Sequence, residues 1–267
     1  MKSMTDPNRL SKALHKGAKI AICCVCLSLG SGHQAFADNT IYLATSVNYP
    51  YVSEGEKEGF LSLLMADVFA RAGLQIRIVR TPGERSLINA NKGIDDGDLV
   101  RTPGMERLFP NLIMVPEESM PFEIMAYSNP GSGITIQGWD SLKPYRVGLI
   151  NNWKILERNT TKVRSRVGVR TIELLFGLLK NQRTDIVLID RLEGLYVSQK
   201  LGIPVEMHEP PLVMAPSHIY LNKRHAKLVP LISAALVATK KDGTYDRLLK
   251  QALKPLGKLY PNVESGN

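Results

Sequence analysis

The sequence predicts an α/β protein of two lobes, with the second lobe inserted into the first and two chain crossings forming a hinge between them. Short apolar or β-branched runs alternate with amphipathic segments of helical period, which is typical of a largely parallel sheet covered by helices. Two turn-rich segments interrupt this alternation, SNPGSG from residue 128 and HEPPLVMAP from residue 208. The simplest account of two breaks between two α/β units is an inserted lobe.

The first 37 residues are predicted to be a signal peptide that is cleaved after Ala37. Five basic residues come first, then the apolar run IAICCVCLSLG, then AFA. A charged, an apolar and a small-x-small region in this order is typical of secretory leaders. The apolar run is about eleven residues long, whereas a membrane span needs roughly twenty. A retained membrane anchor is the alternative. Cleavage would leave a mature chain in the periplasm.

Composition limits the classes of partner. All three cysteines, Cys23, Cys24 and Cys26, lie in the leader, so the mature chain of about 230 residues must be stabilised by its core rather than by disulfides. Removal of the leader lowers the formal charge from +9 to about +5, which favours anionic partners only weakly. We expect a monomer that binds no nucleic acid. The histidines lack metal-ligand spacing and there is no dinucleotide or phosphate-loop motif, so neither a metal nor a cofactor is expected.

The first lobe is predicted to span residues 38–129 and 213–267. Its helix Leu61–Ala72 carries apolar residues on one face and ends at Gly73. The other elements expected before the first break are strands at TIYLATSV, LQIRIVR and Asp98–Arg101 and a helix at GERSLINANKG. After the second break we expect a strand at SHIYLN, a helix Leu228–Ala238 and a last helix with Thr244 as its N-cap.

The second lobe is predicted to span residues 130–212. It begins with a strand in PYRVGLINN and continues with a strongly apolar helix in TIELLFGLLKNQ. A buried strand at TDIVLID follows, and then the helix RLEGLYVSQKLG, which ends at Gly202.

Several segments, taken together in their order and spacing, give the chain a resemblance to a known family. They are Tyr49-Pro50-Tyr51, GFLSLLMADVFARAGL, NANKGIDDGD, ERLFPNLIMVPEE, RVGLINN, NQRTDIVLID and ATKKDGTYDRLL. The chain resembles the type II periplasmic solute-binding proteins of the amino-acid type, family 3, over nearly all of its mature length. The resemblance implies the two-lobe type II periplasmic binding fold with a two-strand hinge.

The resemblance also implies a set of ligand-binding residues. An arginine after the turn that follows the third strand grips the ligand carboxylate, and an aspartate that ends a second-lobe strand holds the ammonium. An aromatic residue after the first strand lies against the ligand side chain, and a helix N-terminus opens the second lobe. The matching residues are Arg107, Asp190, Tyr49 or Tyr51, and Asn152-Trp153 followed by Lys154.

Two positions depart from the family pattern. Asn152-Trp153 stands where the family has Gly-Thr, and Arg101-Thr102-Pro103-Gly104 replaces a Ser-x-Thr. A ligand other than a plain α-amino acid therefore stays open.

Arg101 ends the predicted strand Asp98–Arg101, just past the apolar pair Leu99-Val100, and Arg107 follows six residues later, beyond the Thr-Pro-Gly turn. A guanidinium group donates two parallel hydrogen bonds to a carboxylate, and open α/β sheets bind ligands beyond the carboxyl ends of their strands. We expect one or both arginines to bind an anionic group. The alternative is a turn residue paired with Glu106 or Asp98.

The other candidates have structural alternatives as well. Asp190 precedes a helix and could be an ordinary N-cap. Trp153 could stack on a ligand or pack inside the second lobe, and Tyr49 and Tyr51 could belong to the core.

The expected function is an extracytoplasmic solute-binding protein. Its lobes would close over a small, carboxylate-bearing, amino-acid-like ligand for delivery to an ABC permease or a membrane sensor. The alternative implied by relatives on the same fold is a lyase similar to cyclohexadienyl dehydratase, with Glu84 as a general acid if it faces the cleft. The absence of a carboxylate pair at catalytic spacing favours the binding protein.

Overall fold

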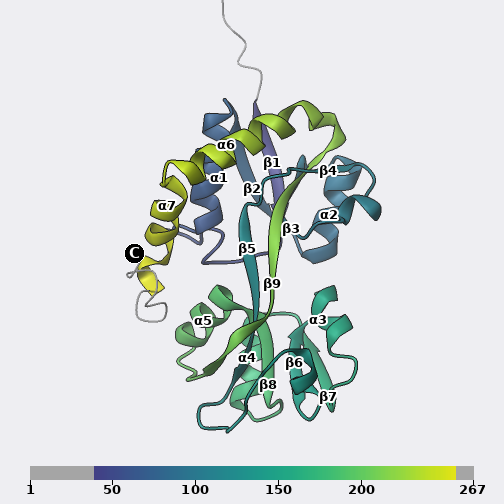
Figure 1. Cartoon of the computed structure of the whole chain (residues 1–267), viewed down its shortest axis with the longest axis vertical. Helices are drawn as coiled ribbons and strands as arrows, with labels where there is room; N and C mark the ends of the chain where they lie inside the picture. Colours follow the sequence, from purple (N-terminus) through teal and green to yellow (C-terminus); the bar gives the residue numbers. More distant parts are fainter. Residues whose placement is uncertain (1–38, 257–267) are drawn as a thin grey trace, which may run out of the picture. The chain divides into compact units, whose positions relative to one another are not determined.

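The computed structural model describes residues 39–256, which belong to the compact unit Asp38–Asn267 (Figure 1). The predicted signal peptide lies outside the described residues. The strands are β1 Thr40–Thr45, β2 Gln75–Arg80, β3 Gly97–Arg101, β4 Leu112–Met114, β5 Met120–Ser128, β6 Arg146–Ile150, β7 Ser165–Val169, β8 Ile186–Asp190 and β9 Glu206–Asn222. The α-helices are α1 Phe60–Arg71, α2 Gly83–Lys92, α3 Lys154–Asn159, α4 Ile172–Lys180, α5 Arg191–Lys200, α6 Val229–Lys241 and α7 Thr244–Leu253.

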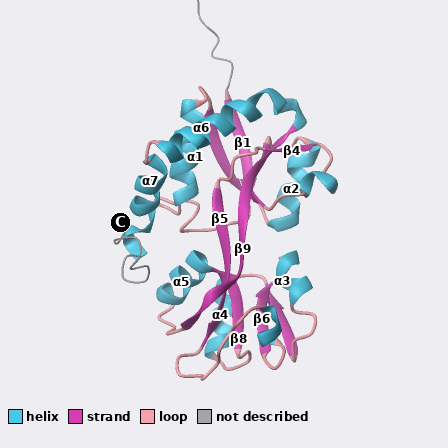
Figure 2. Cartoon of the chain, viewed as in Figure 1, coloured by secondary structure: helices cyan, strands magenta, loops and turns pink. Residues whose placement is uncertain are grey.

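Two long strands connect two α/β halves (Figure 2). The strand order is β2-β1-β3-β9-β5-β8-β6-β7, with β4 paired to β9. Strands β1, β2 and β3 are parallel to one another, as are β6, β7 and β8. The central pair β5 and β9 is antiparallel, and its register shifts between Ile124 and Ala126. These two strands are the chain crossings that the sequence predicts.

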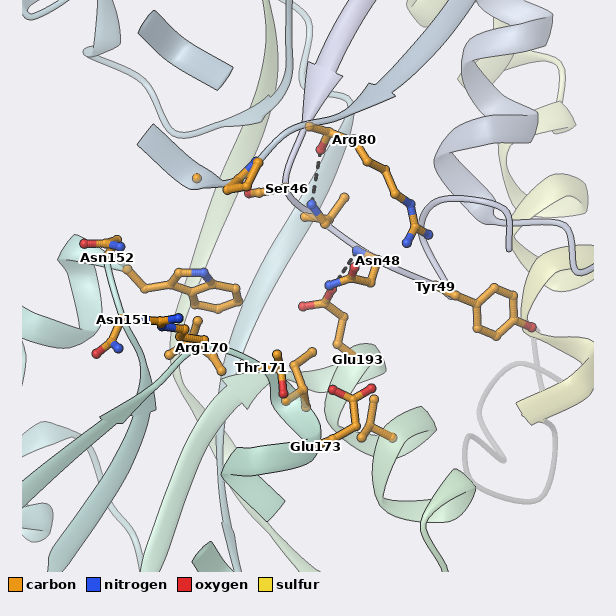
Figure 3. A pocket seen from close by; sticks show the side chains of 18 of the residues that line it. Ser46, Asn48, Tyr49, Arg80, Asn151, Asn152, Arg170, Thr171, Glu173 and Glu193 are labelled. Carbon is orange, nitrogen blue, oxygen red and sulfur yellow. Dashed lines mark hydrogen bonds between the residues drawn. The ribbon is translucent and has the colours of Figure 1, made fainter. Parts of the chain in front are cut away.

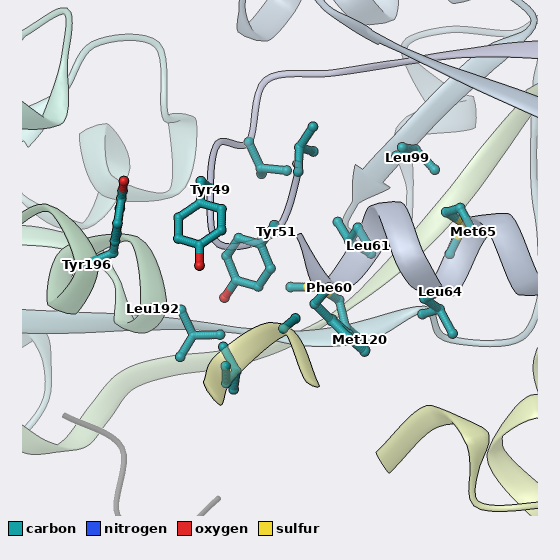
Figure 4. Close-up of a cluster of buried hydrophobic side chains, with 14 of the residues drawn as sticks. Tyr49, Tyr51, Phe60, Leu61, Leu64, Met65, Leu99, Met120, Leu192 and Tyr196 are labelled. Carbon is teal, nitrogen blue, oxygen red and sulfur yellow. The ribbon is translucent and has the colours of Figure 1, made fainter. Parts of the chain in front are cut away.

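The first half has a helix layer on each side of its sheet. Helices α1, α6 and α7 pack on one another, with α1 against β2, and α2 contacts β1 and β3 (Figure 1). Successive side chains of β9 point to opposite faces of the sheet and so contact both helix layers. Ile219 and Leu221 belong to the large core cluster, whereas Tyr220 packs with Leu87 of α2. Figure 4 shows part of the large cluster, in which Leu61 and Met65 of α1 lie nearer Leu99 of β3 and Phe60 lies nearer Tyr51.

The second half uses the same alternation. Val187 and Ile189 of β8 pack in the cluster that contains helices α4 and α5, whereas Ile186 and Leu188 pack in the cluster that contains α3. A strand that is covered on both faces needs an unbroken apolar run, and β8 has one in Ile186–Ile189. Helix α4 begins where the Thr171 side chain accepts a hydrogen bond from the Leu174 N–H, at 3.3 Å.

The α/β class and the principal elements agree with the sequence prediction, and three details differ. Strand β9 continues through HEPPLVMAP, which we expected to be a turn-rich break, because this segment pairs with β5 despite its prolines. Helix α3 and strands β5 and β7 were not among the expected elements; α3 is short, and β7 is exposed and basic. The lobe limits at residues 130 and 212 stay predictions.

The start of α7 is the third difference. Gly243, not Thr244, is the N-cap, and the Asp242 side chain accepts the Thr244 N–H at 2.9 Å. A carboxylate two residues earlier thus supplies the acceptor that we expected from the threonine hydroxyl. Within residues 39–256, no helix combines the length and the apolarity that a membrane crossing requires.

Two helix glycines give opposite expectations for substitution by alanine. A Cβ atom at Gly194 in α5 would lie 2.6 Å from the ring and hydroxyl of the buried Tyr127, whereas a Cβ at Gly177 in α4 would meet no atom within 4 Å. We expect Gly194→Ala to lower the free energy of unfolding by about 1–3 kcal/mol through overpacking. Gly177→Ala should raise it by about 0.5–1 kcal/mol through helix propensity. Urea unfolding measures both, and equal effects would contradict the packing described for α5.

Candidate functional site

A pocket of about 840 Å³ lies between residues of the two lobes (Figure 3). Thr45, Arg80 and Ile150 end β1, β2 and β6, and Arg170 directly follows β7, so the carboxyl ends of parallel strands from both lobes meet at this pocket. Open α/β sheets bind ligands at this edge because the loops and helix starts beyond the strands converge there. The first lobe contributes residues 45–49, 54 and 80–85, and the second contributes 150–153, 170–173, 193, 196, 197 and 200.

Three arginines supply positive charge to the pocket. Arg80, Arg85 and Arg170 are exposed lining residues, and among residues 39–256 none of them has an ion-pair partner. Arg80 and Arg170 come from opposite lobes, and Figure 3 shows their side chains on opposite sides of the space. A guanidinium group that is not already paired can donate a bidentate pair of hydrogen bonds to a carboxylate.

Acidic side chains also line the pocket, in two different states. Glu54, Glu84 and Glu173 are exposed, whereas Glu193 is only 1% exposed. An exposed carboxylate can offer its charge to a solute, but a buried one must first be stabilised by its surroundings.

Aromatic rings form part of the wall. Tyr49 and Tyr196 meet edge to face with ring centroids 4.5 Å apart, and the Lys57 ammonium lies 5.5 Å from the Tyr49 centroid. Trp153 is half-buried and its ring packs on Phe122 at 5.5 Å. Tyr49 and Tyr196 are buried, so the half-buried Trp153 is the ring among these that offers an apolar face beside the charged groups.

Two buried carboxyl groups connect the loop after β1 to the start of α5. Asp190 Oδ1 accepts the Tyr51 hydroxyl at 2.8 Å and the N–H groups of Leu192 and Glu193 at 2.9 and 3.1 Å. Glu193 Oε1 accepts the backbone N–H and the side-chain amide of Asn48, at 2.8 and 3.2 Å. Asp190 Oδ2 and Glu193 Oε2 are buried without a hydrogen-bond partner among the described residues.

Burial dominates the titration of this pair. Burial, together with the nearby Asp190 charge, raises the pKa of Glu193 to about 8, although the Asn48 donors and Arg80 lower it in part. Burial likewise raises the pKa of Asp190 to about 6, against the opposing effect of its hydrogen bonds. Two adjacent buried carboxyls cannot both ionise cheaply, so Glu193 holds a proton at neutral pH.

The sequence-predicted residues fall into two groups. Tyr49, Asn152 and Trp153 line the pocket, whereas Tyr51, Asp190 and Lys154 do not. Tyr51 is 3% exposed in the core and bonds to Asp190, which is also the N-cap of α5, as its structural alternative foresaw. Lys154 is exposed and pairs with Glu157 at 3.2 Å.

Neither of the two expected arginines lines the pocket. Arg101 is paired with Asp98 at 2.9 Å and donates to the Gly83 carbonyl at 2.9 Å and to the Ser86 hydroxyl, so it fixes the first turn of α2. Arg107 is exposed on the short 3₁₀ helix Met105–Arg107. The ligand-binding role of both arginines stays a prediction. For Arg101, the ion pair with Asp98 is the structural alternative that the sequence analysis named.

Sequence reasoning missed Arg80, Arg170 and Glu193. The signal for the two arginines was present, since Arg80 ends the alternating run LQIRIVR and Arg170 ends VRSRVGVR, both at strand carboxyl ends. Glu193 gave no such signal, because a glutamate in the first turn of a helix is usually exposed and favoured by the helix dipole. A cluster of side chains that could hold a metal is absent from residues 39–256.

Comparison with known proteins identifies the fold. No family model and no curated protein sequence matches the chain. Among solved structures, it is similar to the GluR0 ligand-binding core in complex with L-glutamate, at TM-score 0.70 and 14% identity over 80% of this chain and 98% of that one. It is also similar to the substrate-binding protein of an amino acid ABC transporter. The TM-score is 0.65 and the sequence identity 17%, over 80% of this chain and 99% of that one. A histidine kinase sensor domain with similarity to periplasmic binding proteins matches with a TM-score of 0.68 and 16% sequence identity, over 80% of this chain and 96% of that one.

At these identities the likeness shows the fold. The chain has the two-lobe type II periplasmic binding fold, with the second lobe inserted into the first and two strands as the hinge. The sequence prediction of the fold is confirmed.

The two arginines predicted from sequence should differ in their effect on stability. Arg101→Met leaves the buried Asp98 without its cation and should lower the free energy of unfolding by roughly 3–5 kcal/mol. Arg107→Ala, the matched control on the exposed turn, should change it by no more than about 0.5 kcal/mol. Chemical denaturation of both variants tests this, and a stable Arg101→Met protein would contradict the structural role.

The buried carboxyls predict how stability depends on pH. Because the pKa of Glu193 is raised to about 8 in the folded state, above an unfolded value of about 4.3, the folded protein keeps a proton that the unfolded chain has lost. Stability should therefore be highest below that unfolded value and fall as pH rises towards 8, by at most about 1.4 kcal/mol per pH unit for this group.

Asp190 contributes in the same direction up to about pH 6. Urea unfolding at pH 6, 7 and 8 should show the decline in the wild type and a much flatter dependence in Glu193→Gln. An equal slope in both proteins would mean that another group titrates.

Proposed function

We propose that this protein is an extracytoplasmic solute-binding protein whose two lobes close over a small, amino-acid-like ligand that carries a carboxylate. The observation that supports it most strongly is the pair of arginines without ion-pair partners, Arg80 and Arg170, at strand ends of opposite lobes in one pocket. A carboxylate-bearing ligand that contacts both lobes binds the closed arrangement better than an open one, so it shifts the population towards closure.

The volume and wall of the pocket suit a small solute. About 840 Å³ lies within the range of small-molecule sites. The half-buried Trp153 offers an apolar face, while Glu173 and Glu84 could receive a cationic group of the same ligand. A solute with a carboxylate, a polar or cationic group and a short chain would use all of these features.

The closed protein would be recognised by a membrane partner. The similar structures include the binding protein of an amino acid ABC transporter and a histidine kinase sensor domain. Both uses need only that ligand binding changes the surface shared by the two lobes. We propose an ABC permease or a membrane sensor as the partner, and the periplasm as the location.

One observation favours the lyase as a second candidate. Glu84 lines the pocket at the first turn of α2, which meets the condition that we set for a general acid. Incubation with prephenate separates the two functions, because a lyase would release carbon dioxide and water with multiple turnovers, whereas a binding protein would retain at most one equivalent.

Thermal shift of the refolded chain 38–267 with amino acids, dicarboxylates, polyamines and aromatic acids tests the proposal. A ligand at a thousandfold excess over its Kd stabilises the protein by about 4 kcal/mol. Arg80→Ala and Arg170→Ala should each weaken binding by about 1.5–3 kcal/mol, through loss of a charge-assisted hydrogen bond. Arg107→Ala separates the pocket found here from the residue expected by resemblance. Loss of the shift in Arg107→Ala alone, or no shift with any compound, would refute the proposed site.

A further inference from the structure

Glu193 is a buried acidic group in the pocket wall whose hydrogen bonds are incomplete. Its Oε1 atom accepts both Asn48 donors, at 2.8 and 3.2 Å, whereas its Oε2 atom has no partner within residues 39–256. Figure 3 shows the carboxyl reaching from α5 towards the loop that holds Ser46 and Asn48. A buried polar atom without a partner is costly, and a ligand atom at the pocket wall would remove that cost.

The hydrogen bonds and charges around Glu193 decide two things: whether Glu193 or Asp190 carries a proton, and which Glu193 oxygen holds it. Asp190 lies at the start of the same helix and receives three donors on Oδ1, one of them the Tyr51 hydroxyl, so it is the better carboxylate of the two. Arg80 at the end of β2 is the cation that acts on Glu193 across the pocket. With Oε1 occupied by two N–H donors, a proton on Glu193 belongs on Oε2, where it can be donated.

We propose that Glu193 is a specificity-determining residue that, as a neutral carboxylic acid, donates a hydrogen bond from Oε2 to a carboxylate oxygen of the ligand beside Arg80. This inference rests on the proposed function. In this subsite Glu193 and Arg80 both donate hydrogen bonds, so the subsite binds an anionic group. A carboxylate that binds an ammonium group would accept hydrogen bonds instead. Asp190, the residue expected to hold an ammonium, is enclosed by its own donors and lies outside the pocket lining.

Binding to such a subsite requires the Glu193 proton. Since burial raises the pKa of Glu193 to about 8, the affinity for an acid should be constant around pH 7. Above pH 8 it should fall by up to about tenfold per pH unit as the donor is lost and a negative charge faces the ligand. A carboxylate that binds an ammonium would show the opposite sign, with tighter binding as pH rises.

Three five-carbon chains serve as matched probes by calorimetry between pH 6.5 and 9.5. Glutarate has two carboxylates and no group that titrates in this range, 5-aminopentanoate has one carboxylate, and cadaverine has none. We expect glutarate and 5-aminopentanoate to bind and cadaverine not to bind. Glutarate should weaken above pH 8 in the wild type.

Variants assign the pH dependence to one residue. Glu193→Gln keeps an acceptor for Asn48 and a donor for the ligand, so it should bind glutarate within a fewfold at pH 7 and lose the decline above pH 8. Glu206→Gln, at an exposed glutamate that does not line the pocket, is the matched control and should keep the wild-type pH dependence. A flat wild-type profile, or the same decline in Glu193→Gln, would overturn the inference.

A measurement without ligand checks the proton itself. The infrared difference between the wild type and Glu193→Gln at pH 7 should contain the C=O band of a neutral carboxyl, which should disappear by pH 10; no such band would also overturn the inference. If cadaverine or only amino acids bind and glutarate does not, the subsite assignment fails while the proposed function stands. If nothing in the wider panel binds, the proposed function fails and takes the inference with it.

Discussion

The contact between the loop after β1 and the start of α5 joins the two lobes through buried hydrogen bonds, in addition to the strands β5 and β9 that cross between them. Tyr51 donates to Asp190, and Asn48 donates to Glu193, so two carboxyl groups of the second lobe receive hydrogen bonds from the first. Both carboxyls are almost completely buried, which makes their donors essential, because a buried acid without donors is strongly disfavoured. The same contact forms one wall of the pocket, so the interaction that joins the lobes also shapes the site.

Parallel strand topology explains why the pocket contains residues that are distant in sequence. Thr45, Arg80, Ile150 and Arg170 lie at or just beyond the carboxyl ends of four strands, two in each lobe. Because β5 and β9 run through both halves of the sheet, they bring these two sets of strand ends to the same space. A ligand that bridges Arg80 and Arg170 would therefore favour the arrangement in which both lobes contact it, and a transporter or a sensor could recognise that arrangement.

The charge balance of the pocket suggests selectivity rather than simple attraction of anions. Exposed arginines and exposed glutamates line it together, so its net field is modest and each charge acts mainly on the ligand group nearest to it. Burial adds a second level of control by keeping Glu193 protonated at neutral pH. A pocket with both charged and neutral donors can discriminate between solutes of the same net charge, since an unpaired buried group is costly.

The sequence by itself predicted the α/β class, the inserted second lobe and most helices, because periodicity and turn residues are local properties. Its resemblance to a known family pointed to Tyr49, Asn152 and Trp153, which line the pocket. It did not show that β9 would continue through HEPPLVMAP, since only pairing with β5 makes that segment a strand. Nor did it decide which arginines are available: Arg101 is paired to Asp98 and Arg80 is not. The protonation of Glu193 also came only from the tertiary structure, because burial and the distance to Asp190 depend on how distant segments pack.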